Sequence, residues 1–286
     1  MANQIKTGLL LGLLTALLIL LGQALGGRGG LIIALAFAVV MNVGSYWFSD
    51  KIVLSMYRAR ELEQADAPGL FDIVGQLARN AGLPMPRIYL LPQEQPNAFA
   101  TGRDPAHAAV AVTEGLLRMV SPEELAGVLG HEMAHVKHRD ILVQTVTSVV
   151  AGAVTGIAGM LKWGALFGMG GMGRDDDEGG RGAGGAILLA IVAPVAALLI
   201  QMAISRSREF MADETGAKLA GTPLPLAGAL TKLEAYAQTA PMRDANPATE
   251  NMFIVNPLSG AGVAGLFSTH PPTEERVRRL RAMAGH

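Results

Sequence analysis

Two uncharged stretches near the amino terminus constrain the fold of this chain most. Residues 8–27 and 29–48 each contain 20 residues without a charge. A helix of that length rises about 30 Å, which matches the hydrocarbon core of a bilayer. A cleaved signal peptide is the alternative for the first stretch, but its apolar run is longer than usual and a second run follows at once. We therefore predict a transmembrane hairpin over residues 1–50.

Two further uncharged stretches, residues 141–161 and 182–205, predict a second hydrophobic hairpin over residues 141–205. Several Gln, Thr and Ser side chains in the first stretch favour packing against other helices, which leaves open whether it fully spans the bilayer. Pro194 predicts a kink in the second stretch. The Gly- and Asp-rich residues 162–185 between them have little to bury and are expected to form an external loop.

Composition narrows the possible functions. Charged residues make up 16% of the chain, below the roughly 25% of soluble domains, as expected for a membrane protein. With 23 Lys and Arg against 24 Asp and Glu, no basic excess is present to bind nucleic acid. The chain has no cysteine, which excludes disulfides, thiolate metal sites and cysteine nucleophiles. Any metal must therefore be held by His, Asp or Glu.

The basic residues beside the apolar stretches indicate the orientation. They gather on one side, whereas the loop on the other side is locally acidic at residues 175–178. The excess of basic residues predicts that both termini, and the segments 51–140 and 206–286, are cytoplasmic. The basic set consists of Lys6, Lys51, Arg58, Arg60, Lys137, Arg139, Arg206 and Arg208.

Residues 51–140 have the pattern of a globular domain. Asp66 is expected to cap a helix that ends at Gly82, because apolar residues recur at helical spacing between them. Three short β-like runs, at residues 88–91, 98–101 and 108–113, predict a small meander or hairpin. The run Ser121-Pro122-Glu123-Glu124 then combines three signals for the start of a helix.

That helix carries the motif His131-Glu132-Met133-Ala134-His135. At 3.6 residues per turn the two histidines share one face and can bind one zinc ion, while Glu132 can accept a proton from a water. Two incidental histidines in a structural helix are the alternative. The motif falls on a predicted helix, as the zinc interpretation requires.

A catalytic zinc needs a third protein ligand and an open position for water. Glu209 and Asp213 lie four residues apart after the last apolar stretch, so they share a helix face with Arg206. We expect Glu209 to bind zinc, Asp213 to accept a hydrogen bond from a ligating histidine, and Arg206 to orient carboxylates or the oxyanion. A solvated charged face is the alternative for this segment.

Together, residues 131–135 and 209–213 resemble the HtpX-type membrane zinc metallopeptidases, which are relatives of the CAAX prenyl endopeptidases. Residues 96–102 and 269–276 also follow that pattern, so the likeness covers nearly the whole chain. The resemblance implies that His131, His135 and Glu209 hold one Zn²⁺ and that Glu132 is catalytic. It also implies quality control in the bacterial inner membrane, by cleavage of misfolded or damaged membrane proteins.

Two segments are further candidates. The residues Asn97, Ala98, Phe99, Ala100 and Thr101 could form an edge strand that pairs with an extended substrate, or an ordinary hairpin strand. By resemblance to the prenyl endopeptidases, His270 is expected to donate a hydrogen bond to the oxyanion or to reach the zinc. Capping of the terminal helix is the alternative for His270.

These observations predict a mainly α, multi-pass membrane protein with four membrane helices. Its cytosolic catalytic domain is expected to be zincin-like and helical, with a small β-element. The expected activity is that of a zinc metalloendopeptidase whose partners are the lipid bilayer and unfolded polypeptides. If the motif helix continues into residue 141 and beyond, its cleft opens within about 10 Å of the hydrocarbon edge.

Two other functions stay open at this point. One is a substrate-specific processing peptidase of the prenyl endopeptidase type. The other is a zinc-holding membrane scaffold without turnover, against which the intact Glu132 argues, because a structural site needs no proton acceptor.

Overall fold

The computed structural model describes residues 2–149, 206–239, 254 and 271–285. Most of the predicted second hairpin, the whole loop 162–185 and His270 lie outside these residues. The described part is mainly helical, with one small sheet.

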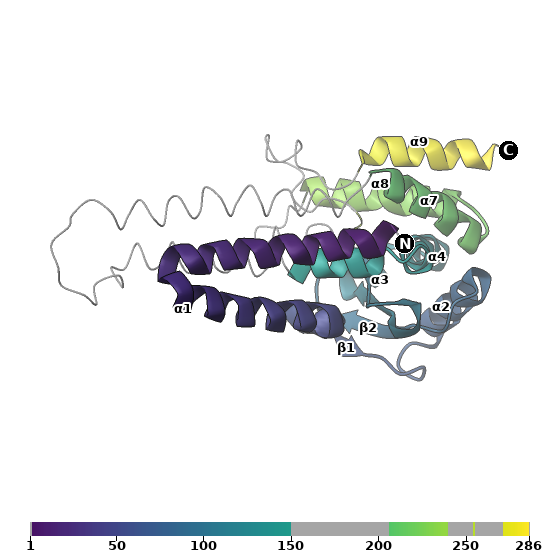
Figure 1. The fold of residues 1–286 in the computed structure, drawn as a ribbon. Helices are drawn as coiled ribbons and strands as arrows, with labels where there is room; N and C mark the ends of the chain where they lie inside the picture. Colours follow the sequence, from purple (N-terminus) through teal and green to yellow (C-terminus); the bar gives the residue numbers. More distant parts are fainter. Residues whose placement is uncertain (1, 150–205, 240–253, 255–270, 286) are drawn as a thin grey trace.

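Helix α1 (Ala2–Met56) folds back on itself and extends to one side of the molecule, away from the sheet (Figure 1). The Nδ2 of Asn42 donates a hydrogen bond of 2.7 Å to the Oγ1 of Thr15, although 27 residues separate them. A straight helix would place such residues about 40 Å apart. Gly27 has a φ of 55°, a left-handed conformation that glycine adopts without strain and that permits the reversal. The amino-terminal segment is therefore a helical hairpin.

Within the described residues, one stretch of helix, Gly27–Met56, is long and apolar enough to cross a membrane. Only 11% of its most apolar window is buried in the molecule, so it does not pack like the core helix of a soluble domain. The predicted number of four membrane helices is thus not shown by the described structure.

The sheet has four strands in the order β1-β2-β4-β3. These are β1 (Arg60–Glu61), β2 (Arg87–Leu91), β3 (Ala98–Thr101) and β4 (Ala109–Thr113). Strands β3 and β4 are antiparallel, as a hairpin requires, but β2 pairs with β4 in parallel. The expectation of a meander is therefore wrong, because β4 inserts between β2 and β3. The short β1 was not predicted.

The two faces of the sheet pack against different parts of the chain. Side chains alternate along β2, so that Ile88 joins the main helical core while Tyr89 and Leu91 face the other way. On that second face they meet Val53 and Leu54 from the end of α1. The sheet thus joins the end of the apolar hairpin to the helical part of the molecule.

Helix α4 lies among the remaining helices, which pack on it from several sides. Its capping box is formed as predicted, with Ser121 as the cap, Pro122 in the first turn and Glu124 closing the box. The cap of α2 is Ala67 instead of the expected Asp66. The Asp66 carboxylate accepts a hydrogen bond from the Glu63 amide and closes a turn before the helix. The helices are α2 (Pro68–Ala81), η1 (Pro105–His107), α3 (Glu114–Met119), α4 (Pro122–Lys137), α7 (Arg206–Ala220), α8 (Leu224–Thr239) and α9 (Thr273–Ala284).

Helices α4 and α7 cross in backbone contact. A Cβ added to Gly130 would lie 2.7 Å from the Gly216 carbonyl oxygen, and one added to Gly216 would lie 2.5 Å from the His131 amide nitrogen. Only glycine fits at both positions. This close crossing brings the first turns of α7 against the histidines of α4.

The helix of the motif does not continue into residue 141. It ends at Lys137, Arg139 has a φ of 58°, and a separate helical run begins at Ile141. The condition of a continuous helix, on which the estimate of about 10 Å depended, is therefore not met. The left-handed turn brings Asp140 back under α4, where its amide donates to the His135 carbonyl oxygen over 2.9 Å.

Candidate metal centre

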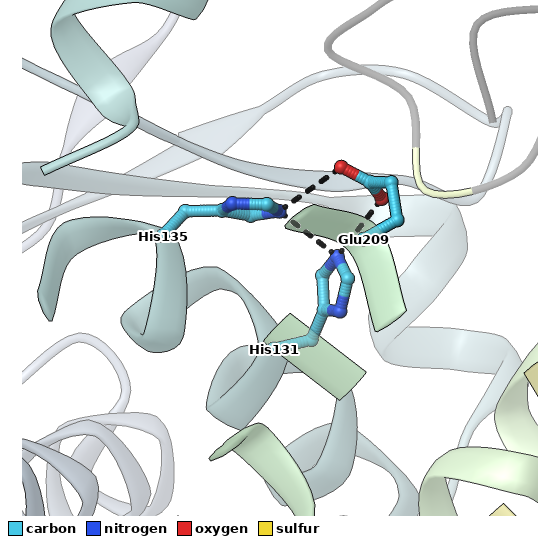
Figure 2. Close-up of side chains that lie close together, drawn as sticks. All are labelled: His131, His135 and Glu209. Atoms are coloured by element: carbon cyan, nitrogen blue, oxygen red, sulfur yellow. Dashed lines mark hydrogen bonds and ion pairs between the residues drawn. The ribbon is translucent and has the colours of Figure 1, made fainter. Parts of the chain in front are cut away.

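Three buried side chains converge between α4 and α7. His131 and His135 are one turn apart on α4, and both imidazoles point toward Glu209 of α7 (Figure 2). The two Nε2 atoms are 3.2 Å apart. The Glu209 oxygens lie 3.6 Å from the Nε2 of His131 and 3.5 Å from that of His135. One donor atom from each residue lies within 4.8 Å of the others, so the three could hold a single metal ion.

A carboxylate contacts the Nδ1 side of His131, away from Glu209, and an arginine holds that carboxylate. The Nδ1 of His131 lies 2.8 Å from the Oδ1 of Asp213. Arg276 of α9 donates two hydrogen bonds to the same carboxylate, of 2.8 and 2.7 Å. Burial raises the pKa of Asp213, but the charges and hydrogen bonds of Arg276 and His131 together outweigh it and lower that pKa to about 2. Asp213 is therefore an ionised acceptor that holds the proton of His131 on Nδ1.

A second carboxylate supports His135. The Oδ2 of Asp140 lies 3.3 Å from the Nδ1 of His135, and the Nη1 of Arg208 lies 3.5 Å from Asp140. Asp140 is available there because of the left-handed turn at Arg139. Both histidines thus have Nδ1 directed at a carboxylate and Nε2 at Glu209, the arrangement typical of metal-ligating histidines.

The donor set fits a tetrahedral metal ion. Ligands at the usual zinc distances of 2.0–2.2 Å lie about 3.3 Å apart in tetrahedral geometry, close to the separations of 3.2, 3.5 and 3.6 Å seen here. When both imidazoles are neutral and carry their protons on Nδ1, the Nε2 atoms and the Glu209 oxygens offer lone pairs to a metal ion. Burial lowers the pKa of His131, but hydrogen bonds to Asp213 and Glu209 outweigh it and raise this pKa to about 9. The cluster therefore attracts positive charge.

Glu132 links the cluster to the sheet. It is buried and follows His131 on α4. Its Oε2 accepts a hydrogen bond of 2.9 Å from the Ala100 amide of β3. Burial raises the pKa of this carboxyl, so its charged form gains proton affinity. A carboxylate in this position can take and return a proton beside the three ligands.

The predicted substrate strand is β3, and it lies at the edge of the sheet. All four of its residues are buried, backbone included, and its Ala100 amide is bonded to Glu132. Asn97, just before it, is also buried, and its Oδ1 accepts a hydrogen bond from the Ile254 amide. The Ile254 carbonyl in turn accepts from the Nη1 of Arg276. Residue 254 thus bridges the start of the strand to the arginine behind His131.

Two predicted site residues are not brought to this cluster by the described structure. Arg206 is exposed in the first turn of α7, while the arginines that contact the carboxylates behind the histidines are Arg208 and Arg276. His270 lies outside the described residues. Arg276 was missed as a site residue. The available signal was its place on the apolar side of the terminal helix beside Val277 and Leu280, where a buried arginine needs a carboxylate partner.

Two histidines and a glutamate from crossing helices, a buried glutamate beside them and an edge strand along the cluster define a metallopeptidase. The comparisons with known proteins agree with this class. The chain belongs to peptidase family M48, whose sequence pattern matches residues 64–284. It is therefore a metal-dependent protease of the hydrolase class.

Relatives match over almost the full length. The chain is 58% identical over 283 residues to a "Protease HtpX homolog" of Syntrophobacter fumaroxidans, covering 99% of this chain and 100% of that protein. It is 53% identical to a protein of the same description from Thermococcus sibiricus, over 98% of this chain and 96% of that protein. These similarities confirm the resemblance to the HtpX-type enzymes.

The crystal structure of Ste24p from S. mikatae has a similar fold. It aligns with a TM-score of 0.53 and 17% identity, covering 98% of this chain. The chain spans 65% of the length of Ste24p. At this identity the likeness extends to the fold only.

Proposed function

We propose that this chain is a membrane-bound zinc endopeptidase that cleaves misfolded or damaged membrane proteins near the cytosolic membrane surface. The observation that carries the proposal is the position of Glu132. Its carboxylate contacts the edge strand β3, and the preceding residue on α4 is one of the three converging ligands. The proton acceptor, the metal ligands and a strand that can align a polypeptide thus meet at one place.

The site residues have two roles in the proposed reaction, metal binding and proton transfer. His131, His135 and Glu209 would hold the zinc, with Asp213 and Asp140 orienting the two imidazoles. A zinc ion held there would polarise the scissile carbonyl and acidify a water. Glu132 accepts a proton from that water and passes it to the leaving amine, without a covalent acyl-enzyme.

Strand β3 offers a means to hold many different sequences. The Asn97 carbonyl accepts a hydrogen bond from the Thr113 amide of β4, so by antiparallel alternation the backbone groups of Ala98 and Ala100 point away from β4. The Ala100 amide donates to Glu132. A substrate carbonyl that pairs with this amide would take over the donor and release the Glu132 carboxylate to act as a base. Backbone pairing of this kind does not depend on side chains.

The fold supports cleavage close to the bilayer. The end of α1 packs on the face of the sheet through Val53, Leu54 and Phe99, so the apolar hairpin is joined directly to the strand beside Glu132. An extended substrate has unsatisfied backbone groups, which the hydrocarbon forbids and the interface tolerates. We therefore expect cuts in cytosolic loops and juxtamembrane segments that have unfolded locally.

The placement in a bacterial inner membrane with cytoplasmic termini is part of this proposal and is supported by the positions of the basic residues. The likeness to Ste24p, being one of fold, does not favour the alternative of a processing peptidase. His270 stays a prediction for the oxyanion or the zinc. Arg206 is exposed and the buried carboxylates are paired with Arg208 and Arg276, so for Arg206 a role toward the oxyanion stays a prediction.

The decisive experiment compares the purified protein with its Glu132→Gln variant. The variant should retain one zinc per chain, because all three ligands remain, and should lose at least about 100-fold of its activity on an unfolded membrane protein. Metal analysis and a cleavage assay in detergent measure both. A variant that loses zinc and activity together would show that Glu132 is a ligand or a structural residue. Retention of full activity would remove it from the mechanism.

A further inference from the structure

The second arm of the α1 hairpin, which follows Gly27, exposes apolar side chains and buries polar ones along residues 32–49. A helix of a water-soluble protein does the opposite. The buried side chains from Ala38 to Ser49 are small or polar: Ala38, Ser45 and Ser49 are buried, and Asn42 bonds to Thr15 of the other arm. The outward side chains of the second arm are large and apolar, and they include Ile33, Val40 and Trp47, which are 72%, 68% and 52% exposed. Water would favour the opposite arrangement, so the surroundings of this stretch are apolar.

The polarity returns to that of a soluble protein within the same helix. Val53 and Leu54 are buried against the sheet, while Lys51 and Ser55 are exposed. Asp50 lies just before this turn of helix and forms an ion pair of 2.8 Å with Arg87 of β2. The change from lipid-like to water-like surroundings therefore falls between Trp47 and Lys51.

Two cations lie over exposed aromatic rings at this boundary. The guanidinium of Arg103, in the loop after β3, is 4.9 Å from the ring centroid of Trp47. The ammonium of Lys51 is 5.7 Å from that of Phe48. The neighbouring acidic group, Asp104, contacts the Nε of Arg103 at 3.6 Å and also binds the Nδ1 of His107. Aromatic rings with basic side chains beside them are typical of the headgroup region.

We propose that the bilayer surface crosses α1 between Trp47 and Lys51, where Arg103 and Lys51 bind the phosphates of anionic phospholipids. The loop after β3 then rests on the headgroups. Ala100 is three residues before Arg103, about 10 Å along an extended strand. The edge of β3 beside Glu132 therefore lies within about 10 Å of the lipid phosphates that Arg103 contacts. This inference depends on membrane association and not on the peptidase chemistry.

The two tryptophans of the chain make a direct test possible. In a Trp163→Phe variant, Trp47 is the single tryptophan. Reconstituted into vesicles, its fluorescence should be quenched more strongly by lipids brominated near the headgroup end of the acyl chain than by lipids brominated near the chain terminus. Stronger quenching by the deep label, or quenching by aqueous iodide alone, would overturn the proposed boundary.

The Trp163→Phe variant also measures whether anionic lipids are preferred over neutral ones beside Trp47. In mixtures with neutral phosphatidylcholine, brominated phosphatidylglycerol should quench Trp47 more than brominated phosphatidylcholine does. Lys51→Gln and Arg103→Gln should each reduce this preference by about fivefold, the ratio that corresponds to about 1 kcal/mol per basic residue near an anionic surface. Each variant is normalised to its own unquenched emission, because Arg103 contacts the ring.

Arg281→Gln is the matched control, because Arg281 is exposed on α9, at the end of the molecule opposite the turn of α1 (Figure 1). It should leave the preference unchanged. An unchanged preference in the Lys51 and Arg103 variants as well would overturn the phosphate contacts. Zinc content and cleavage measured in the same vesicles separate this result from a failure of the proposed peptidase function, which would leave the depth of Trp47 unaltered.

Discussion

Helices α1 and α4 both bury polar side chains, but they do so against opposite surroundings. In α4 the buried His131 and His135 each meet a carboxylate, and these carboxylates pair with Arg276 and Arg208. Between Ile32 and Ser49 of α1 the buried residues are small or weakly polar, and large apolar residues are exposed. The first arrangement creates a site that requires a cation, whereas the second suits a helix pair in lipid. The difference predicts large effects of substitutions around α4 and small ones within α1.

The largest effect is expected from the third ligand. Glu209→Ala should abolish stoichiometric zinc binding and cleavage, because two histidines alone leave the site short of a donor and of negative charge. Metal analysis and the cleavage assay test it. Glu214→Ala on the same helix is the control, because Glu214 is exposed and paired with Lys218, and it should change neither quantity. Full zinc and activity in the Glu209 variant would show that the third ligand is another residue.

The next largest effect concerns the carboxylates behind the histidines. Asp213→Asn and Asp140→Asn should each weaken zinc binding by about 10–100-fold. Asp213→Asn should also destabilise the fold by about 3–5 kcal/mol, because it leaves the fully buried Arg276 without its carboxylate. Zinc titration and denaturant unfolding of the two variants separate these effects. Equal unfolding free energies would mean that Arg276 finds another partner.

A pair of glycine substitutions compares the two regions directly. Gly216→Ala should cost about 1–3 kcal/mol, because its Cβ would meet the His131 amide at 2.5 Å and force α7 away from the metal ligands. Gly44→Ala in α1 should be neutral or slightly stabilising, because no atom lies within 4 Å of the added Cβ. Thermal unfolding in detergent and zinc content measure both. If the two variants behave alike, the close crossing of α4 and α7 is not what places Glu209.

The smallest effect is expected inside the hairpin. Asn42→Leu removes the hydrogen bond to Thr15 and should cost about 0.6 kcal/mol, the average for such bonds between membrane helices. Unfolding in mixed detergent measures it. A loss of several kcal/mol would indicate that the two arms pack as in a water-soluble core, and the contrast with α4 would no longer hold.

The local features of the chain could be predicted with good accuracy. The start of α4 at the Ser121 capping box was predicted correctly, and the structure brings Glu209 and Asp213 to the histidines as expected. These depend on spacing within one element or on pairs of motifs. Strand β3, left open between an edge strand and a hairpin strand, is both. The cap of α2 was wrong, because Asp66 closes a turn with the Glu63 amide instead.

Errors were concentrated where distant segments meet. The spacing of the three β-like runs could not show that β4 would insert in parallel beside β2. The sequence could not show whether α4 continues into residue 141; it is interrupted at Arg139, whose left-handed conformation is one that residues other than glycine rarely adopt. The spacing of Arg206 from Glu209 favoured it as a partner of the carboxylates, but Arg208 and Arg276 are the arginines that reach them; its alternative role toward the oxyanion stays a prediction.

By itself the sequence determined the two histidines one helix turn apart, the glutamate between them and the apolar stretches long enough for a bilayer. Each of these follows from residue spacing and composition. Only the tertiary structure decided that Asp140 and Arg276 support the histidines and that the Ala100 amide contacts Glu132. The physical reason is that a buried charge takes whichever partner the packing of other elements brings within hydrogen-bonding distance. That packing depends on backbone contacts such as Gly130 against Gly216, which no local pattern specifies.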